Sequence, residues 1–385
     1  MRRTILVGAA AAVVLWTQLS ASIGLQGGPE LTSYRDFGSL WASGQAANDG
    51  LDPYDPSPMT FRVRTPTGEQ VAVNLNPPLS VLFLQATAWF DPSFMFRFWQ
   101  LGSALTYVAI VLLLTRLFPS PDGWLRALLM LLWQPFWSTL ELGQIYIALM
   151  VPTTAALLLI DRHPTAAGLC IGLLAALKPP FLLWPLLLLG ARQWRPALVA
   201  IGASVGLSAV PAILGHLAWY EQWVEASRDT ARTLLLTDNL SWLSVLVRFG
   251  VPANIGLALI GVALLLLLVF VARQRMPARQ VSAIALVAAI LASPVAWVAY
   301  VVLLVPIFLT RRYWPEPLLV ASLLFAVPGA LLWWSIGSGF VVYELALLLC
   351  LVGLLFDGPR TAPEHSSVGG RMAIRRAADL AREYR

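Results

Sequence analysis

One polar stretch of the sequence, residues 34–55 (YRDFGSLWASGQAANDGLDPYD), carries the residues best suited to acid–base chemistry. A carboxylate placed beside a reacting hydroxyl can take its proton as the hydroxyl attacks. If the chain is an enzyme, we expect Asp36 to be this general base. Asp is also a favoured N-cap residue, so the alternative role of Asp36 is to cap a helix that begins at Phe37. The other aspartates of the stretch stand among turn-forming residues and are expected to serve turns: Asp49, Asp52 and Asp55.

A single lysine, Lys178, stands out among the basic residues, because all the others are arginines. It follows the uncharged run 164–177 and precedes two prolines. A charge at membrane depth is costly and by default indicates function, so we expect Lys178 to bind an anionic group such as a phosphate. The alternative is that its side chain extends to the membrane surface. Arg35 and Arg248 are weaker candidates for the same task, and Arg35 has the alternative of pairing with an acid.

Polar and aromatic side chains near helix-breaking residues could hold a sugar. Glu141 and Gln144 flank Gly143, and Asn76 precedes two prolines. Tyr54 and Trp297 could stack on a sugar ring, although an interfacial aromatic belt also explains such residues. The sequence has no His/Cys metal cluster and no Gly-rich phosphate loop, and its first loop has no Asp-x-Asp motif. We therefore expect neither a metal nor another cofactor.

The composition is that of an all-α polytopic membrane protein. Of the 385 residues, 58% are hydrophobic and only 12% are charged, whereas soluble domains have about 25% charged residues. Both cysteines, Cys170 and Cys350, lie in apolar runs and indicate no disulfide framework. The net charge of +6 reflects arginines that follow membrane topology, so no nucleic-acid partner is expected.

The breaks between apolar runs predict about twelve transmembrane helices in residues 1–356, followed by a basic cytoplasmic tail, 357–385. The loop 26–78 is expected to be extracytoplasmic, with turns around one helix near 37–48, and the run 79–90 is too short to cross and should be interfacial or re-entrant. A cleaved signal peptide is the alternative for the first run. The predicted spans are 5–23, 96–117, 125–140, 145–160, 165–178, 181–190, 197–214, 255–272, 281–292, 297–310, 317–332 and 340–356.

The charges support this topology, with both termini cytoplasmic. It places 18 of the 26 basic residues inside, as the positive-inside rule expects, and most acids of the loops outside. Several spans are short, which suits helices broken around a protein-lined cavity. The breaks 76–78, 143–144, 178–180 and 293–294 all fall on the outer side, where Asp36 lies.

Six motifs in order carry a resemblance to a known family: RDFGSLWASGQAANDGLDPYD, NLNPPL, LGQIYIALM, AGLCIGLLAALKPPFLLWPLLLL, NLSWLSVLVRFG and SPVAWVAY. Together they resemble glycosyltransferase family 87, which has the GT-C fold and includes mannosyltransferases that use polyprenyl-phosphate mannose. The motifs span about two thirds of the chain.

The resemblance implies inverting transfer of a sugar, with mannose as the first candidate, from a polyprenyl phosphate to a hydroxyl of a lipid or glycan acceptor. The reaction would take place on the outer face of the bacterial cytoplasmic membrane, without a metal. Asp36 matches the aspartate of the family's first loop. The sequence departs from the family after Trp297, where relatives often have a polar pair with a histidine and this chain has Val298, Ala299 and Tyr300.

Two alternatives of another class stay open. A transporter or flippase for lipid-linked sugars also uses broken helices around a cavity, and the chain could be a non-catalytic member of the family. A transporter needs polar residues through both halves of the bilayer, whereas the inner halves of these spans are nearly all apolar. This asymmetry favours an enzyme open to one face.

Overall fold

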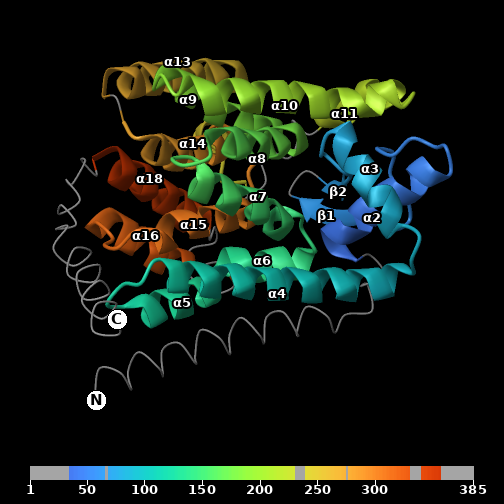
Figure 1. Cartoon of the computed structure of the whole chain (residues 1–385). Coiled ribbons are helices and arrows are strands. Elements are labelled where there is room, and N and C mark those ends of the chain that lie inside the picture. The colour runs from blue at the N-terminus through green and yellow to red at the C-terminus, as the bar shows by residue number, and fades with distance from the viewer. Residues whose placement is uncertain (1–33, 66–67, 230–238, 275, 330–339, 357–385) are drawn as a thin grey trace, which may run out of the picture.

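The computed structural model describes residues 34–65, 68–229, 239–274, 276–329 and 340–356, which form a helical bundle with one small hairpin (Figure 1). In this part of the chain three helices are long and apolar enough to cross a membrane: α4 (Pro92–Leu117), α10 (Trp194–Ile213) and α13 (Ala253–Gln274). The 26 residues of α4 span about 39 Å, more than the roughly 30 Å of a hydrocarbon core. A helical membrane protein is thus confirmed, whereas the count of twelve crossings stays a prediction. The expected first span and the basic tail lie outside the described residues.

Shorter apolar helices fill the bundle between these three. Its centre is α14 (Ala278–Ala292), in which the run from Val281 to Leu291 is buried, together with η4 (Val298–Leu304), which is buried throughout. Protein surrounds these two elements, so they need not match the thickness of the bilayer. The other members of this group are α5 (Gly123–Leu132), α6 (Gln134–Leu142), α7 (Tyr146–Leu159), α8 (Pro164–Leu177), η2 (Pro179–Leu182), α9 (Leu183–Gly190), α15 (Val305–Leu309), α16 (Glu316–Phe325) and α18 (Phe340–Phe356).

The expectation of one continuous span over 125–140 is wrong, because the chain breaks between α5 and α6. Trp133 is extended there, with φ −61° and ψ 126°, and Pro135 follows in the first turn of α6. A proline fits the first turn of a helix but cannot donate a hydrogen bond to a preceding turn, so it begins a new helix here.

The first loop contains more regular structure than expected. The predicted helix near 37–48 is α2 (Arg35–Asn48), and the short run after the loop is α3 (Pro78–Thr87). Between them lies an unpredicted antiparallel hairpin of β1 (Phe61–Thr65) and β2 (Gly68–Ala72), in which Phe61 pairs with Ala72. Two further helices, α11 (Ala218–Asp229) and α12 (Trp242–Arg248), occupy the later loop.

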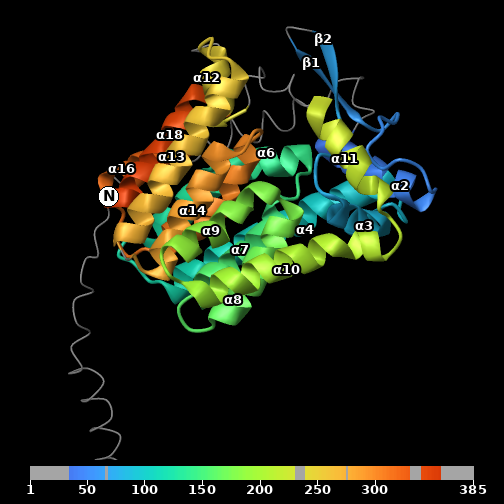
Figure 2. The same ribbon diagram turned by 90° about the horizontal axis from the view of Figure 1, so that it is seen from above.

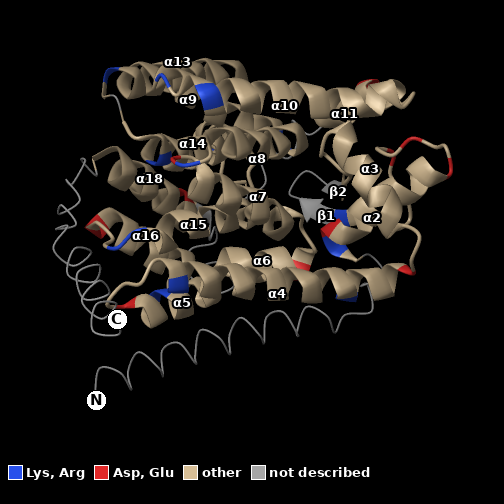
Figure 3. Ribbon diagram, in the orientation of Figure 1, with Lys and Arg blue, Asp and Glu red and all other residues tan. Residues whose placement is uncertain are grey.

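Charged residues gather at the two ends of the bundle and leave its middle almost free of charge (Figure 3). We call the end with α2, α3, α11 and the hairpin the loop end. The opposite end, with α5 and α16, is the arginine end, where Arg126 of α5 donates to the carbonyl of Arg311. Large aromatic side chains are exposed toward both ends, as in the aromatic belts of membrane proteins. They are Trp89, Phe90 and Phe94 near the loop end, and Trp124, Trp194 and Tyr313 near the arginine end.

Candidate active site at the loop end

Asp36 lies in the first turn of α2, and its side chain does not cap that helix. The helix begins at Arg35, its N-cap residue is Tyr34, and no side chain caps it. The carboxylate of Asp36 instead accepts a hydrogen bond from Nε2 of Gln144, at the start of the α7 segment. The alternative of an N-cap aspartate is therefore wrong, and two predicted site residues meet across the fold.

A left-handed glycine makes this meeting possible. Gly143 ends α6 with φ +67°, a conformation that residues with a Cβ rarely adopt. A Cβ at this position would lie 2.6 Å from the Cβ of Phe37 and 2.7 Å from the ring of Phe96. The absence of a side chain thus lets α2 pack against the turn, and the next residue, Gln144, faces Asp36.

Arg35 and Glu141 pair with each other across the same α2–α6 contact. Arg35 Nη2 lies 3.6 Å from Oε1 of Glu141, and both side chains are about four-fifths buried. The guanidinium also lies over the ring of Phe61. Arg35 has a left-handed backbone, with φ +52°, directly before Asp36. Strain of this kind is unusual for a residue with a side chain and concentrates at functional sites.

Lys178 ends α8 at the junction with η2 and is 9% exposed. Its ammonium lies over two aromatic rings, 5.4 Å from the ring centre of Tyr146 and 5.1 Å from that of Tyr300. Within the described residues, no carboxylate lies in ion-pair range of this ammonium. The side chain is therefore a largely buried cation held by rings.

Tyr146 connects this cation to Asp36. Its ring centre lies 4.2 Å from that of Tyr300, and its ring also contacts the Lys178 ammonium. Gln144, which binds Asp36, is only two residues earlier in the chain. Tyr146 was not among the residues predicted from the sequence; its position three residues after the Gly143 break was the available signal.

Asn76 and Tyr54 lie in the packed base of the loop end. The Tyr54 ring is 3% exposed, and its hydroxyl donates to the carbonyl of Asn76, so packing replaces the expected sugar stacking. The side-chain Nδ2 of Asn76 donates to Asn74, while its Oδ1 has no partner among the described residues. Asn76 therefore keeps a buried acceptor without a partner among the described residues at the Pro77–Pro78 break.

The NLSW and SPVAW motifs bind each other at their turns. Asn239 and Ser241 donate side-chain hydrogen bonds to the carbonyl of Pro294. The amide of Ala296 in turn donates to Oδ1 of Asn239. Trp297, which directly precedes η4, is half-buried against the main apolar cluster rather than open as a stacking platform.

Arg248 is the predicted phosphate ligand that the structure places elsewhere. Its guanidinium forms an ion pair with Glu344 of α18. Figure 2 shows α12, which carries Arg248, beside α13 and α18 and well apart from α2. We therefore assign Arg248 to the contact between α12 and α18.

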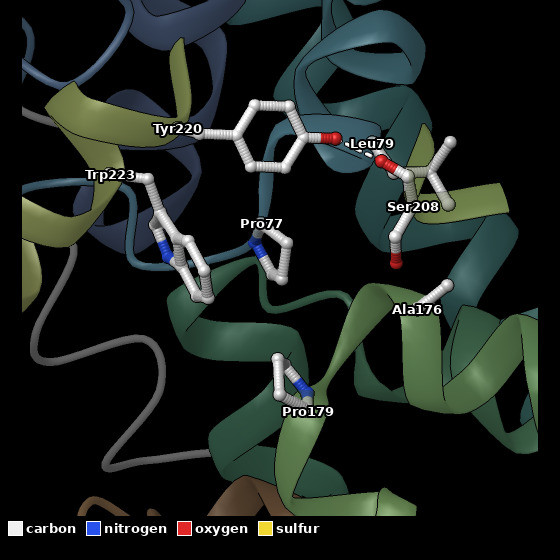
Figure 4. A pocket seen from close by; sticks show the side chains of 7 residues that line it. All are labelled: Pro77, Leu79, Ala176, Pro179, Ser208, Tyr220 and Trp223. Atoms are coloured by element: carbon white, nitrogen blue, oxygen red, sulfur yellow. Dashed lines mark hydrogen bonds between the residues drawn. The ribbon is translucent and has the colours of Figure 1, made fainter. Parts of the chain in front are cut away.

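A small, mostly apolar cavity of about 130 Å³ lies beside the Lys178 junction (Figure 4). Ala176 and Pro179, which flank Lys178 in the sequence, form one wall, and Pro77 forms another. Tyr220 and Trp223 close it from α11, and the Tyr220 hydroxyl donates to the carbonyl of Ser208. Two of the predicted breaks, 76–78 and 178–180, thus lie side by side.

No group of three or more metal-ligating side chains occurs among the described residues. The amide, hydroxyl and ammonium groups at the loop end suit hydrogen bonds to a sugar and a phosphate better than coordination of a divalent ion. Metal independence stays a prediction.

The fold and this site define a helical membrane protein whose polar groups meet at one end of an apolar bundle. The family model of glycosyltransferase family 87 matches residues 74–294, more than half of the chain, and the chain belongs to this family. The protein is therefore a membrane glycosyltransferase, and the transporter alternative is not retained. The matched segment includes Gln144 and Lys178, whereas Asp36 precedes it. No curated protein sequence matches the chain.

Proposed function

We propose that the protein transfers a sugar, with mannose as the first candidate, from a polyprenyl phosphate to a hydroxyl of a lipid or glycan acceptor, with inversion at C1. Asp36 takes the proton of the acceptor hydroxyl as its oxygen bonds to C1. The bond from C1 to the phosphate oxygen breaks on the opposite face, and polyprenyl phosphate leaves with the bonding electron pair. Lys178 stabilises the charge that develops on this phosphate.

The observation that carries the proposal is the connection of a carboxylate and a buried cation through one turn. Gln144 binds Asp36, and Tyr146, two residues later, contacts Lys178. An inverting transfer needs one base and one site for the departing anion, on opposite faces of the sugar. Groups fixed by the fold stabilise developing charge without reorganising during the reaction.

The cavity beside Lys178 supports a lipid-linked donor. A cavity of about 150 Å³ can hold benzene, so about 130 Å³ suits one five-carbon isoprene unit. Ile213 and Val205 on the same helix as Ser208 are 79% and 65% exposed, which places the cavity near the lipid-facing surface. A polyprenyl chain can thus run from a phosphate at Lys178 into the surrounding lipid.

The sidedness of the reaction follows from the arginines. The positive-inside rule places the arginine end in the cytoplasm, so the loop end faces the outside of a bacterial cytoplasmic membrane. A polyprenyl-phosphate sugar fits this side, because the sugar arrives already attached to a membrane lipid.

The test is sugar transfer in membranes that contain the wild-type protein, Asp36→Asn or Asp49→Asn. Labelled polyprenyl-phosphate sugars serve as donors and envelope lipids as acceptors. Asp49, the exposed C-cap residue of the same helix, accepts a side-chain hydrogen bond from Gln45, so it is the matched control. We expect Asp36→Asn to lose about 10²–10⁴-fold in rate and Asp49→Asn to keep its rate. Equal activity of both variants would exclude Asp36 as the base, and no wild-type transfer with any donor would indicate a non-catalytic member.

A second test addresses the donor lipid. Ser208→Leu places bulk in the cavity, whereas Gly206→Leu places it on the same helix where nothing lies within 4 Å. We expect Ser208→Leu to raise the KM about tenfold for donors with long polyprenyl chains. The rise should be much smaller for a donor in which a methyl group replaces the polyprenyl chain. A rise independent of chain length, or an equal rise in Gly206→Leu, would exclude this path.

A further inference from the structure

We propose that Tyr146 and Tyr300 form an aromatic cage that positions the ammonium of Lys178 for the donor phosphate. The inference rests on the proposed function and adds two positioning residues that the sequence did not indicate. Both rings lie within 5.4 Å of the ammonium, on two elements far apart in the chain, α7 and η4.

The cage explains how a largely buried cation is held without a carboxylate. An ammonium over the face of an aromatic ring gains roughly 0.5–2 kcal/mol, the larger value when water is excluded. An ion pair would hold Lys178 as firmly, but its carboxylate would cancel the positive charge that a phosphate needs. Two neutral rings orient the ammonium and leave its full charge available.

The rings are themselves fixed, so they can act as a rigid support. Tyr146 is 1% exposed and Tyr300 is 3% exposed, and their ring centres lie 4.2 Å apart at an interplanar angle of 34°. Because Gln144, two residues before Tyr146, donates a hydrogen bond to Asp36, the same turn positions both the cage and the proposed base.

The turn before η4 determines where the ring of Tyr300 lies. η4 begins directly after the SPVAW turn and points the ring of Tyr300 toward Lys178. The turn is held by Asn239, which binds both Pro294 and Ala296. The contact between the NLSW and SPVAW turns therefore places one wall of the cage, Tyr300, which lies three residues after Trp297.

The experiment separates the cage from simple packing by comparing two product-like inhibitors. Polyprenyl phosphate carries the anion and polyprenol of the same length does not, and the inhibition constant of each is measured for the wild type, Tyr300→Phe and Tyr300→Leu. We expect Tyr300→Leu to weaken inhibition by the phosphate about 5- to 30-fold, the equivalent of roughly 1–2 kcal/mol, and to leave polyprenol within about twofold. Tyr300→Phe retains the ring and should retain the preference for phosphate.

A double variant guards against effects of misfolding. In a Lys178→Met background the cation is absent, so Tyr300→Leu should cause no further loss of phosphate binding. The proposal is overturned if Tyr300→Leu weakens both inhibitors equally, if Tyr300→Phe behaves like Tyr300→Leu, or if the loss persists without Lys178. A wild type that binds polyprenol as well as polyprenyl phosphate would instead overturn the donor in the proposed function, and the cage with it.

Discussion

Replacing Gln144 tests whether the α7 turn orients the general base. The Gln144 side chain donates a hydrogen bond to one carboxylate oxygen of Asp36 and has no other role in the proposed transfer. In Gln144→Ala the carboxylate keeps its charge but loses this constraint. We therefore expect the catalytic rate to fall while the affinity for the donor phosphate is retained.

The size of the fall follows from the strength of the lost bond. A hydrogen bond to a charged group contributes about 1.5–3 kcal/mol. Because 1.36 kcal/mol corresponds to a factor of ten in rate, the expected loss in kcat is about 10- to 150-fold. This lies below the loss expected for Asp36→Asn, since the base itself remains.

The assay is steady-state sugar transfer by detergent-purified protein, measured in a double-mutant cycle. If Gln144 acts only through Asp36, Gln144→Ala in an Asp36→Asn background should change the residual rate by less than about threefold. Gln45→Ala is the matched control, because Gln45 also donates to an aspartate, the C-cap residue Asp49 of α2, but in an exposed hydrogen bond. The reasoning is wrong if Gln45→Ala has an equal effect, or if the loss in Gln144→Ala is the same with and without the Asp36 carboxylate.

Three further predictions concern stability, each measured by thermal unfolding in detergent at matched detergent concentration. Gly44→Ala should destabilise by about 1–3 kcal/mol, because its Cβ would lie 2.2 Å from a backbone oxygen of α3, whereas Gly102→Ala, in open space, should not. Arg248→Gln should lower the free energy of unfolding by about 3 kcal/mol, because it leaves Glu344 unpaired. Adding Glu344→Gln should restore part of this stability. If Arg248→Gln instead loses activity and keeps its stability, Arg248 belongs to the donor site. Burial raises the pKa of Asp52; neighbouring acids raise it further, and a hydrogen bond from a backbone N–H lowers it by less than burial raises it. Above this raised pKa the ionised side chain destabilises the folded protein. Asp52→Asn should therefore unfold at a higher temperature than the wild type at pH 7, and the difference should vanish below about pH 3, where both folded and unfolded Asp52 are protonated.

The sequence predicted the elements that depend on local signals. Apolar length and the prolines placed α4, α7, α8, α10 and α13 within a few residues of their observed ends. The hairpin was missed because its two strands have only five residues each and lie inside a polar loop with no long alternating pattern. The break at Trp133 was missed because Pro135 was interpreted as lying within a span, although a proline equally fits the first turn of a new helix.

At the site, the charged residues could be selected from the sequence, whereas the aromatic residues around them could be identified only in the structure. Asp36 and Lys178 could be selected as candidates from the sequence, because a carboxylate in a polar loop and a lone lysine in an apolar run are each unusual where they stand. Tyr146 and Tyr300 are ordinary aromatic residues in apolar segments, and about 150 residues separate them. Their importance arises only when the turn at Gly143 and the turn at Pro294 bring both rings to one ammonium. A charged residue in an apolar segment can be recognised from the sequence, because its burial costs free energy. The neutral groups that orient it can be recognised only by their position in the fold.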